Sequence, residues 1–259
     1  MERFKAALRI QFLVLKALMI RELTARFGRE NIGFLWLMAE PLLFAGLVGI
    51  VWTFMKGPES HGISVVAFVA SGYIPLTFMR HAFSKSACIF VANGALLYHR
   101  QIRILDFVIT RVVIEAIGAM MAYVFIGAVL CYFDLFPVPA DVSSLLLGWG
   151  IYVLFVLSIS LVLAPLSEVS EVVEKLVPVS TYIAIPFSGT FNMTSWLGPT
   201  AGSYLMWSPM VSGMELMRAG LFGAAVTPYY DITLALSVSL VCLTIGLILC
   251  RRVRKILAA

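Results

Sequence analysis

Two stretches of this sequence, 145–165 and 232–250, contain no charged residue. Each is close to the ~20 apolar residues that a helix needs to cross the hydrocarbon core of a bilayer. The rest of the chain agrees: 61% of it is hydrophobic and only 13% is charged, whereas about a quarter of a soluble domain is charged. Open sheet edges in lipid would leave backbone groups unpaired, so we expect an all-α integral membrane protein.

Further apolar stretches extend this prediction to six transmembrane helices. We place these spans at about 34–55, 63–92, 107–133, 145–165, 176–193 and 232–250. Residues 34–259 then form one transmembrane domain, and residues 1–33 precede it as a separate segment.

The basic residues predict the orientation. With the N-terminus in the cytoplasm, only Lys56 and Arg218 of the 19 Lys and Arg residues fall in outer loops. The N-terminal segment, the loop after span two and the tail with Arg251, Arg252 and Arg254 all fall inside. Because cytoplasmic loops of membrane proteins are enriched in Lys and Arg, we expect both termini in the cytoplasm.

The segment before span one predicts an amphipathic helix. Basic residues lie mostly between apolar residues that recur three or four positions apart. These apolar residues are Phe4, Leu8, Phe12, Leu15, Leu18 or Met19, and Leu23. This pattern favours a helix lying in the cytoplasmic headgroup layer. A helix packed on a soluble partner is the alternative.

The stretch 196–231 predicts short helices between spans five and six. Pro199, Pro209 and Pro228 interrupt it, and apolar pieces of 10 to 14 residues suit re-entrant helices better than full crossings. Glu215 and Arg218 lie three positions apart, so we expect them to neutralise each other on one helix face.

Motifs for catalysis are missing from the sequence. It contains no GxxxxGK[ST] phosphate loop, no HExxH and no GxSxG. The histidines and cysteines are scattered, which gives no metal site and no cofactor. We therefore predict no enzymatic activity for the chain by itself.

Several local motifs resemble those of one transporter family. The runs 21–28 (RELTARFG), 33–36 (GFLW) and 40–42 (EPL) resemble the region before and at span one of ABC-2 type permeases. Four later runs resemble the capsular-polysaccharide export subfamily: 186–189 (PFSG), 207–209 (WSP), 214–220 (MELMRAG) and 229–231 (YYD). These runs carry the residues to which we give structural roles, which are Arg21, Glu22, Arg26, Trp36, Glu40, Glu215 and Arg218.

The resemblance implies an ATP-driven exporter in the bacterial inner membrane. It implies a homodimer of six-span subunits, a channel between the protomers and two ATPase subunits that bind ATP and Mg. It also implies periplasmic and outer-membrane partners that carry the polymer onward. Permeases for O-antigen or teichoic acid are similar, and export of a small drug or lipid is a weaker alternative. A membrane enzyme would need a catalytic cluster, which the sequence lacks.

The same resemblance assigns a coupling role to the loop after span two. The predicted contacts with the ATPase are Tyr98, His99, Arg100 and Arg103, with Glu168 and Glu171 as a second cytoplasmic contact. The alternatives are an ordinary basic loop and a solvated acidic helix turn.

Span two and several aromatic residues are candidates for the substrate pathway. Arg80, His81 and Lys85 lie within a span, where a charge normally faces a cavity or a partner. They would attract an acidic polymer, or alternatively extend toward the headgroups.

Rings that could stack on sugars are Tyr73, Phe78, Tyr123, Tyr152, Trp196, Tyr204 and Trp207. For any single ring, an interface anchor or core packing is the favoured explanation. For the other charges in the spans, we expect Glu40 to pair with Arg21 or Arg26, and Glu115 with Arg111.

Overall fold

The computed structural model describes residues 2–27, 33–87, 89–97 and 102–257. Helices dominate the described residues, which confirms the all-α class. The long helices are α1 (Glu2–Phe27), α2 (Gly33–Lys56), α3 (Val65–Ser86), α6 (Ile104–Tyr132), α7 (Val142–Val169) and α11 (Ile232–Leu257). The shorter ones are α4 (Ile89–Ala92), α5 (Gly94–Leu97), α8 (Glu171–Ile183), α9 (Pro199–Met206) and α10 (Pro209–Phe222), with 3₁₀ turns η1 (Pro186–Ser188), η2 (Thr194–Trp196) and η3 (Gly223–Ala225).

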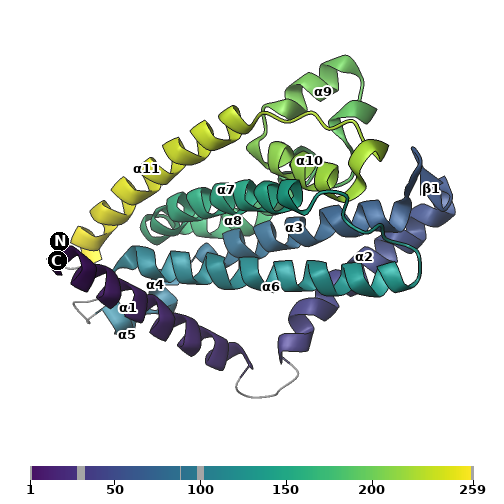
Figure 1. Ribbon diagram of the computed structural model, residues 1–259. Helices are drawn as coiled ribbons and strands as arrows, with labels where there is room; N and C mark the ends of the chain where they lie inside the picture. Colours follow the sequence, from purple (N-terminus) through teal and green to yellow (C-terminus); the bar gives the residue numbers. More distant parts are fainter. Residues whose placement is uncertain (1, 28–32, 88, 98–101, 258–259) are drawn as a thin grey trace.

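The bundle has two distinct ends. The start of α1 and the end of α11 lie at the same end of the bundle, which we call the terminal end (Figure 1). At the opposite end, β1 (Glu59–Ser60) and β2 (Ile63–Ser64) form a short antiparallel hairpin. Its two turn residues, His61 and Gly62, have φ of +56° and +75°, as a tight hairpin turn requires. We call this the hairpin end.

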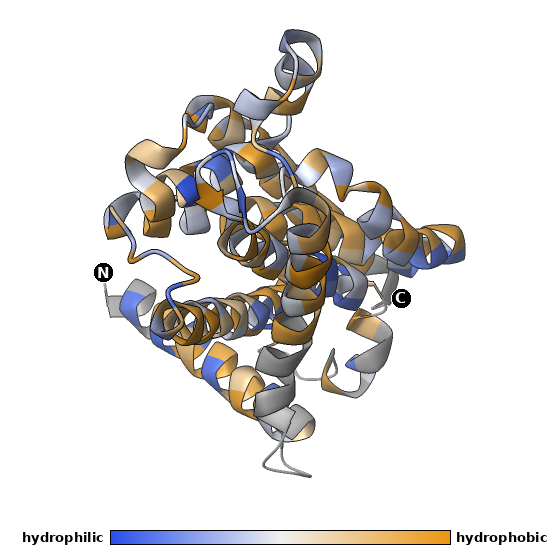
Figure 2. Cartoon of the chain, turned by 90° about the vertical axis from the view of Figure 1, so that its right-hand side faces the viewer, coloured by the Kyte–Doolittle hydropathy of each residue, from blue (hydrophilic) through white to orange (hydrophobic). Residues whose placement is uncertain are grey.

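Three helices among the described residues are long and apolar enough to cross a membrane. They are α6, α7 and α11 up to Arg254, and a shorter apolar helical stretch covers Leu42–Met55 of α2. Figure 2, seen from the hairpin end, shows hydrophobic residues along nearly every helix rather than only on inward faces. Large side chains such as Phe54 (86% exposed) and Val124 (63%) therefore need lipid or protein around them.

Two of the predicted spans differ from the structure. The stretch 63–92 begins with β2, continues as α3 and resumes as α4 after a break. The stretch 176–193 is not a single helix, because α8 begins at Glu171, ends at Ile183 and is followed by η1. At 13 residues, α8 is too short to cross a bilayer alone. Pro186 then begins η1, and Gly189, which has φ +71°, follows its end.

The predicted N-terminal helix is present, but its apolar residues are arranged differently from the prediction. α1 is helical over Glu2–Phe27, but its apolar residues do not form one face. Leu18 is buried, whereas Leu8, Phe12 and Leu23 are exposed together with Ile20, which lies off the predicted stripe. Placement of this helix in the headgroup layer stays a prediction.

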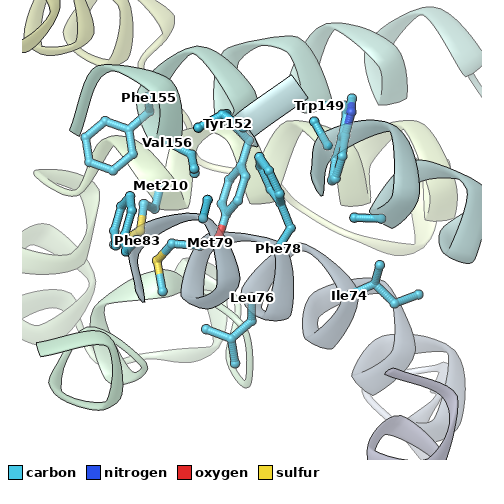
Figure 3. Packing of buried hydrophobic residues seen from close by; sticks show 14 of the residues in the cluster. Ile74, Leu76, Phe78, Met79, Phe83, Trp149, Tyr152, Phe155, Val156 and Met210 are labelled. Atoms are coloured by element: carbon cyan, nitrogen blue, oxygen red, sulfur yellow. The ribbon is translucent and has the colours of Figure 1, made fainter. Parts of the chain in front are cut away.

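The core forms where α3 and α7 meet. Phe78, Trp149 and Tyr152 pack with ring centroids 5.4–6.5 Å apart, and Met79, Phe83 and Met210 lie around them (Figure 3).

Asp141 begins α7 as its N-cap, accepting a hydrogen bond from the backbone N–H of Ser143 at 2.9 Å. Hydrogen bonds from the hydroxyls of Ser143 and Ser144 lower the pKa of the Asp141 carboxyl to about 2.

The short helices between α8 and α11 are confirmed, and α10 is buried in the protein. It packs on α7 through glycines. A Cβ at Gly148 would lie 2.6 Å from the backbone nitrogen of Met217, and one at Gly220 would lie 2.6 Å from the carbonyl oxygen of Asp141. Glycine therefore sets how closely α7 and α10 approach each other.

We predict that Gly148→Val destabilises the protein and Gly150→Ala does not. A side chain at Gly148 must displace backbone of α10, and overpacking of this kind costs about 1–3 kcal/mol or more. Gly150 has open space around it. The thermal midpoint and monodispersity of the detergent-purified variants measure the difference. Equal behaviour of the two variants would contradict this packing.

Candidate functional site

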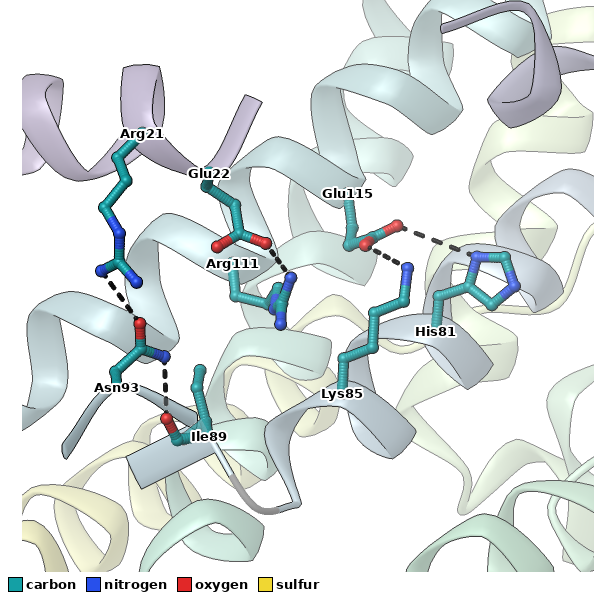
Figure 4. Close-up of polar contacts among 8 residues, drawn as sticks. All are labelled: Arg21, Glu22, His81, Lys85, Ile89, Asn93, Arg111 and Glu115. Carbon is teal, nitrogen blue, oxygen red and sulfur yellow. Dashed lines mark hydrogen bonds and ion pairs between the residues drawn. The ribbon is translucent and has the colours of Figure 1, made fainter. Parts of the chain in front are cut away.

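Among the described residues, polar side chains within the bundle gather toward each of its two ends. At the terminal end, Glu115 of α6 is only 2% exposed and accepts a hydrogen bond from the Lys85 ammonium of α3 at 2.9 Å. The Nδ1 atom of His81 lies 3.8 Å from the other Glu115 oxygen (Figure 4). Lys85 and His81 thus reach Glu115 from a neighbouring helix, and the expected Arg111–Glu115 pair stays a prediction.

The first helix is joined to this group by its own polar residues. Glu22 of α1 accepts a hydrogen bond from Arg111, and Arg21 donates to the Asn93 amide oxygen at 3.1 Å (Figure 4). Asn93 also donates to the carbonyl of Ile89 at 2.8 Å. Arg21 and Glu22 thus hold α1 against α6 and the α4–α5 region. The side chains of Arg26, Trp36 and Glu40 lie outside the described part of the chain, so the expected Glu40 pairing stays a prediction.

Arg80 of α3 has different surroundings from Lys85 and His81. Its guanidinium lies 4.2 Å from the ring centroid of Tyr182 at the end of α8, a cation–π contact. Its Nε is buried and has no hydrogen-bond partner, while the Tyr182 ring is 59% exposed. The contact thus lies at the surface of the single chain, where α8 stops. Nothing in the local sequence around Tyr182 marks it as the partner of Arg80, so it was not among the predicted pathway residues.

The aromatic candidates divide into interior and exposed rings. Tyr73, Phe78, Tyr123 and Tyr152 are all less than 8% exposed and pack on other rings. Of the two explanations left open by the sequence, burial in this chain favours core packing for these four.

The remaining aromatic candidates lie near the hairpin end. Tyr204 and Trp207 are 78% and 75% exposed. Trp196 is stacked on His61 at 4.3 Å and tilted against Phe68 at 4.5 Å, so both neighbours cover its ring. Tyr204 and Trp207 are therefore the candidates with rings free to meet a ligand. Tyr204 also lines an open cavity of about 480 Å³ with Phe187 and Asn192.

At the hairpin end, the predicted Glu215–Arg218 ion pair is wrong. Both side chains are buried in α10, at 1% and 0% exposed, and no ion pair joins them among the described residues. Arg218 donates to the carbonyl oxygen of Gly189 at 2.6 Å, to that of Phe68 at 3.4 Å and to that of Thr190. Its guanidinium also lies 3.8 Å from the Phe68 ring centroid.

Glu215 makes the complementary contacts to backbone N–H groups. Its carboxylate accepts hydrogen bonds from Thr194 at 2.7 Å and Tyr229 at 3.2 Å. The Arg218 guanidinium thus holds the turn after η1 against α3. The Glu215 carboxylate holds η2 and the chain before α11 against α10. Irregular backbone buried at this depth needs such partners.

A glycine in α3 makes room for the arginine. A Cβ at Gly72 would overlap the Arg218 guanidinium and lie 2.5 Å from the Thr190 carbonyl oxygen. Any larger residue at this position would push the guanidinium out of hydrogen-bonding distance.

The predicted coupling residues lie at the terminal end where they are described. Arg103 precedes α6, and Glu168 and Glu171 flank the α7–α8 junction. Tyr98, His99 and Arg100 lie outside the described residues. In the described ranges, no group of three or more His, Cys, Asp or Glu side chains comes together as metal ligands would.

We predict that Arg218→Gln lowers the stability of folding by about 1–3 kcal/mol for each buried carbonyl oxygen that it leaves without a donor, such as those of Gly189 and Thr190. Gly72→Ala should also destabilise. In the double variant, the loss of folding stability should be smaller than the sum of the two single losses. The reason is that the guanidinium, which the new methyl group would displace, is already absent. Thermal unfolding of the four proteins measures this coupling, with Arg252→Gln as an exposed control. An Arg218→Gln protein as stable as the wild type would contradict it.

Comparison with known proteins gives full-length relatives, although no family model matches the chain. The capsule polysaccharide export inner-membrane protein BexB of Haemophilus influenzae is 34% identical over 252 residues, which cover 97% of this chain and 95% of the relative. CtrC of Neisseria meningitidis serogroup B, with the same description, is 34% identical over the same shares of both chains. The polysialic acid transport protein KpsM of Escherichia coli is 23% identical over 255 residues, covering 95% of this chain and 96% of KpsM.

Proposed function

We propose, since this chain belongs to the family of capsule polysaccharide export inner-membrane proteins, that it is the membrane permease of an ATP-driven exporter of capsular polysaccharide. The observation that carries this proposal is the similarity along 97% of the chain to relatives named for capsule export. It agrees with a chain of apolar helices whose sequence contains no nucleotide-binding loop of its own. Hydrolysis of ATP therefore belongs to partner subunits.

The proposed topology has six crossings with both termini in the cytoplasm. Five crossings are α2, α3, α6, α7 and α11. The sixth combines α8 with the chain that follows it to the turn at Gly189. Basic residues support this orientation, because Arg103, Arg251 and Arg254 all lie at the terminal end. The hairpin end then faces the periplasm.

The proposed assembly contains two copies of this chain and two ATPase subunits. Exposed apolar side chains support a protein or lipid neighbour along α2 and α8, including Leu47 and Phe54 on α2 and Val172, Leu176 and Ile183 on α8. A second copy against α8 would cover these exposed side chains.

We place the coupling to the ATPase at the terminal end. The segment between α5 and α6 connects directly to α6, and the Ser170 junction connects α7 to α8. A rigid-body push on either connection would therefore tilt helices that reach the core. Glu168 and Glu171 offer negative charge at the second connection.

The proposed route for the polymer passes Arg80 and the exposed rings. Tyr182, Phe187 and Tyr204 follow one another along the chain from the end of α8 to α9, and each is more than half exposed. Aromatic faces can stack on sugar rings without fixing one position, and Arg80 adds a positive charge at the start of this series. His81 and Lys85 are paired with Glu115, so we assign them to the α3–α6 contact.

Loss of the gene tests the function. We expect capsular polymer to accumulate inside the cell and to disappear from the surface. Restoration by the wild-type gene should fail when the partner ATPase carries an inactivated phosphate loop. Surface polymer that persists without this chain, or without ATP hydrolysis, would contradict the proposal.

The proposed route has its own test in the same strain. Arg80→Gln and Tyr182→Ala should each lower surface polymer several-fold at unchanged protein level. Tyr132→Ala, which removes another exposed ring (84%) from the end of α6, should leave it unchanged. Equal effects of all three variants would contradict the route while leaving the exporter assignment intact.

A further inference from the structure

A groove with a basic end lies between α6 and α11 at the terminal end of the bundle. Its volume is about 620 Å³, and it is lined by Arg103, Arg251 and Arg254 and by Leu105, Leu247 and Ile248, among others. Leu247, Ile248, Arg251 and Arg254 share one face of α11, since they are spaced by three or four residues. The arginines on α11 lie nearer the helix end, and the leucine and isoleucine lie deeper along the helix.

The described lining of the groove is basic. Asp106, next to it in α6, is fully buried and accepts hydrogen bonds from the Arg103 backbone N–H at 2.9 Å and from Gln11 at 2.5 Å. Arg254 is close enough to interact with Asp106 electrostatically. Three guanidinium groups therefore line the groove, and no carboxylate is among its described lining residues.

These arginines are available to a ligand. All three are exposed. Among the described residues, no carboxylate lies within 4 Å of their guanidinium groups. Arg111 and Lys85, by contrast, each contact a glutamate carboxylate. A pocket with convergent cations at one end and apolar walls beyond it matches a molecule with an anionic head and a hydrocarbon tail.

We propose that this groove binds an anionic phospholipid of the cytoplasmic leaflet. Its phosphate would accept hydrogen bonds from Arg103, Arg251 and Arg254, and an acyl chain would lie along Leu105, Leu247 and Ile248. Charge complementarity favours this occupant, because basic pockets between membrane helices on the cytoplasmic side bind acidic lipid headgroups. The inference depends on the orientation in the membrane and not on the identity of the exported polymer. It gives the Arg103 side chain a lipid contact rather than an ATPase contact.

Native mass spectrometry of the purified full-length protein tests the site. Phosphatidylglycerol and phosphatidylcholine with identical acyl chains serve as probes. We expect the wild type to retain phosphatidylglycerol in preference. The triple variant Arg103→Gln, Arg251→Gln, Arg254→Gln should lower its affinity at least tenfold. Arg252→Gln is the matched control, because Arg252 lies on the same turn of α11 but does not line the groove, and it should have no effect.

Two further arms separate the sources of the anion. Inorganic phosphate at millimolar concentration should not displace the lipid, and Ile248→Asn should weaken lipid binding without changing the charge. Equal retention of both lipids by the wild type would overturn the proposal even if the triple variant fails to fold. Full displacement by inorganic phosphate, or an equal loss in Arg252→Gln, would also overturn it. So would a triple variant that loses the ATPase subunit and keeps phosphatidylglycerol.

Discussion

The hairpin half of this protein depends on one buried cation. Arg218 is completely buried and donates to carbonyl oxygens from the turn after η1 and from α3, while Glu215, one turn earlier in α10, accepts from the chain before α9 and before α11. Where the chain leaves regular helix inside an apolar protein, its backbone groups need partners. One α10 helix with a cation and an anion supplies both kinds. Gly72 on α3 leaves the space that the Arg218 guanidinium fills. Gly148 and Gly220 let α7 and α10 approach closely.

The sequence predicted the parts of the fold that composition determines. Long apolar runs located α6, α7 and α11 within a few residues, and the prolines after residue 196 indicated short helices. It did not predict where α8 ends, because hydropathy counts the apolar residues around Pro186 and Gly189 as though the helix continued. Charge partners were predicted from spacing along one helix, and this is why the Glu215–Arg218 ion pair was wrong and the contact of Lys85 with Glu115 was not foreseen. Lys85, Glu22 and the carbonyl of Gly189 come from other elements, and only the tertiary structure brings them close.

Burial separates structural residues from candidate functional ones. Lys85, His81 and Glu115 join α3 to α6, and the inner rings such as Phe78 and Tyr152 form the core. By contrast, Arg80 with Tyr182, the rings of Phe187 and Tyr204, and the arginine groove between α6 and α11 remain at the surface. In a protein of a capsule export family, these surfaces are where a polymer, a second subunit or a lipid can act. α8, too short to cross the membrane alone, connects the terminal end to the exposed rings.

The orientation of the bundle in the inner membrane underlies the coupling, the route and the lipid site, and cysteine labelling tests it most directly. His61→Cys in the hairpin and Arg252→Cys in α11 are compared in a chain whose own cysteines are replaced by serine or alanine. Both positions are exposed. In intact spheroplasts, a membrane-impermeant maleimide should label the cysteine at position 61 and not the one at position 252, which should react only after lysis. Labelling of position 252 from outside would contradict the account.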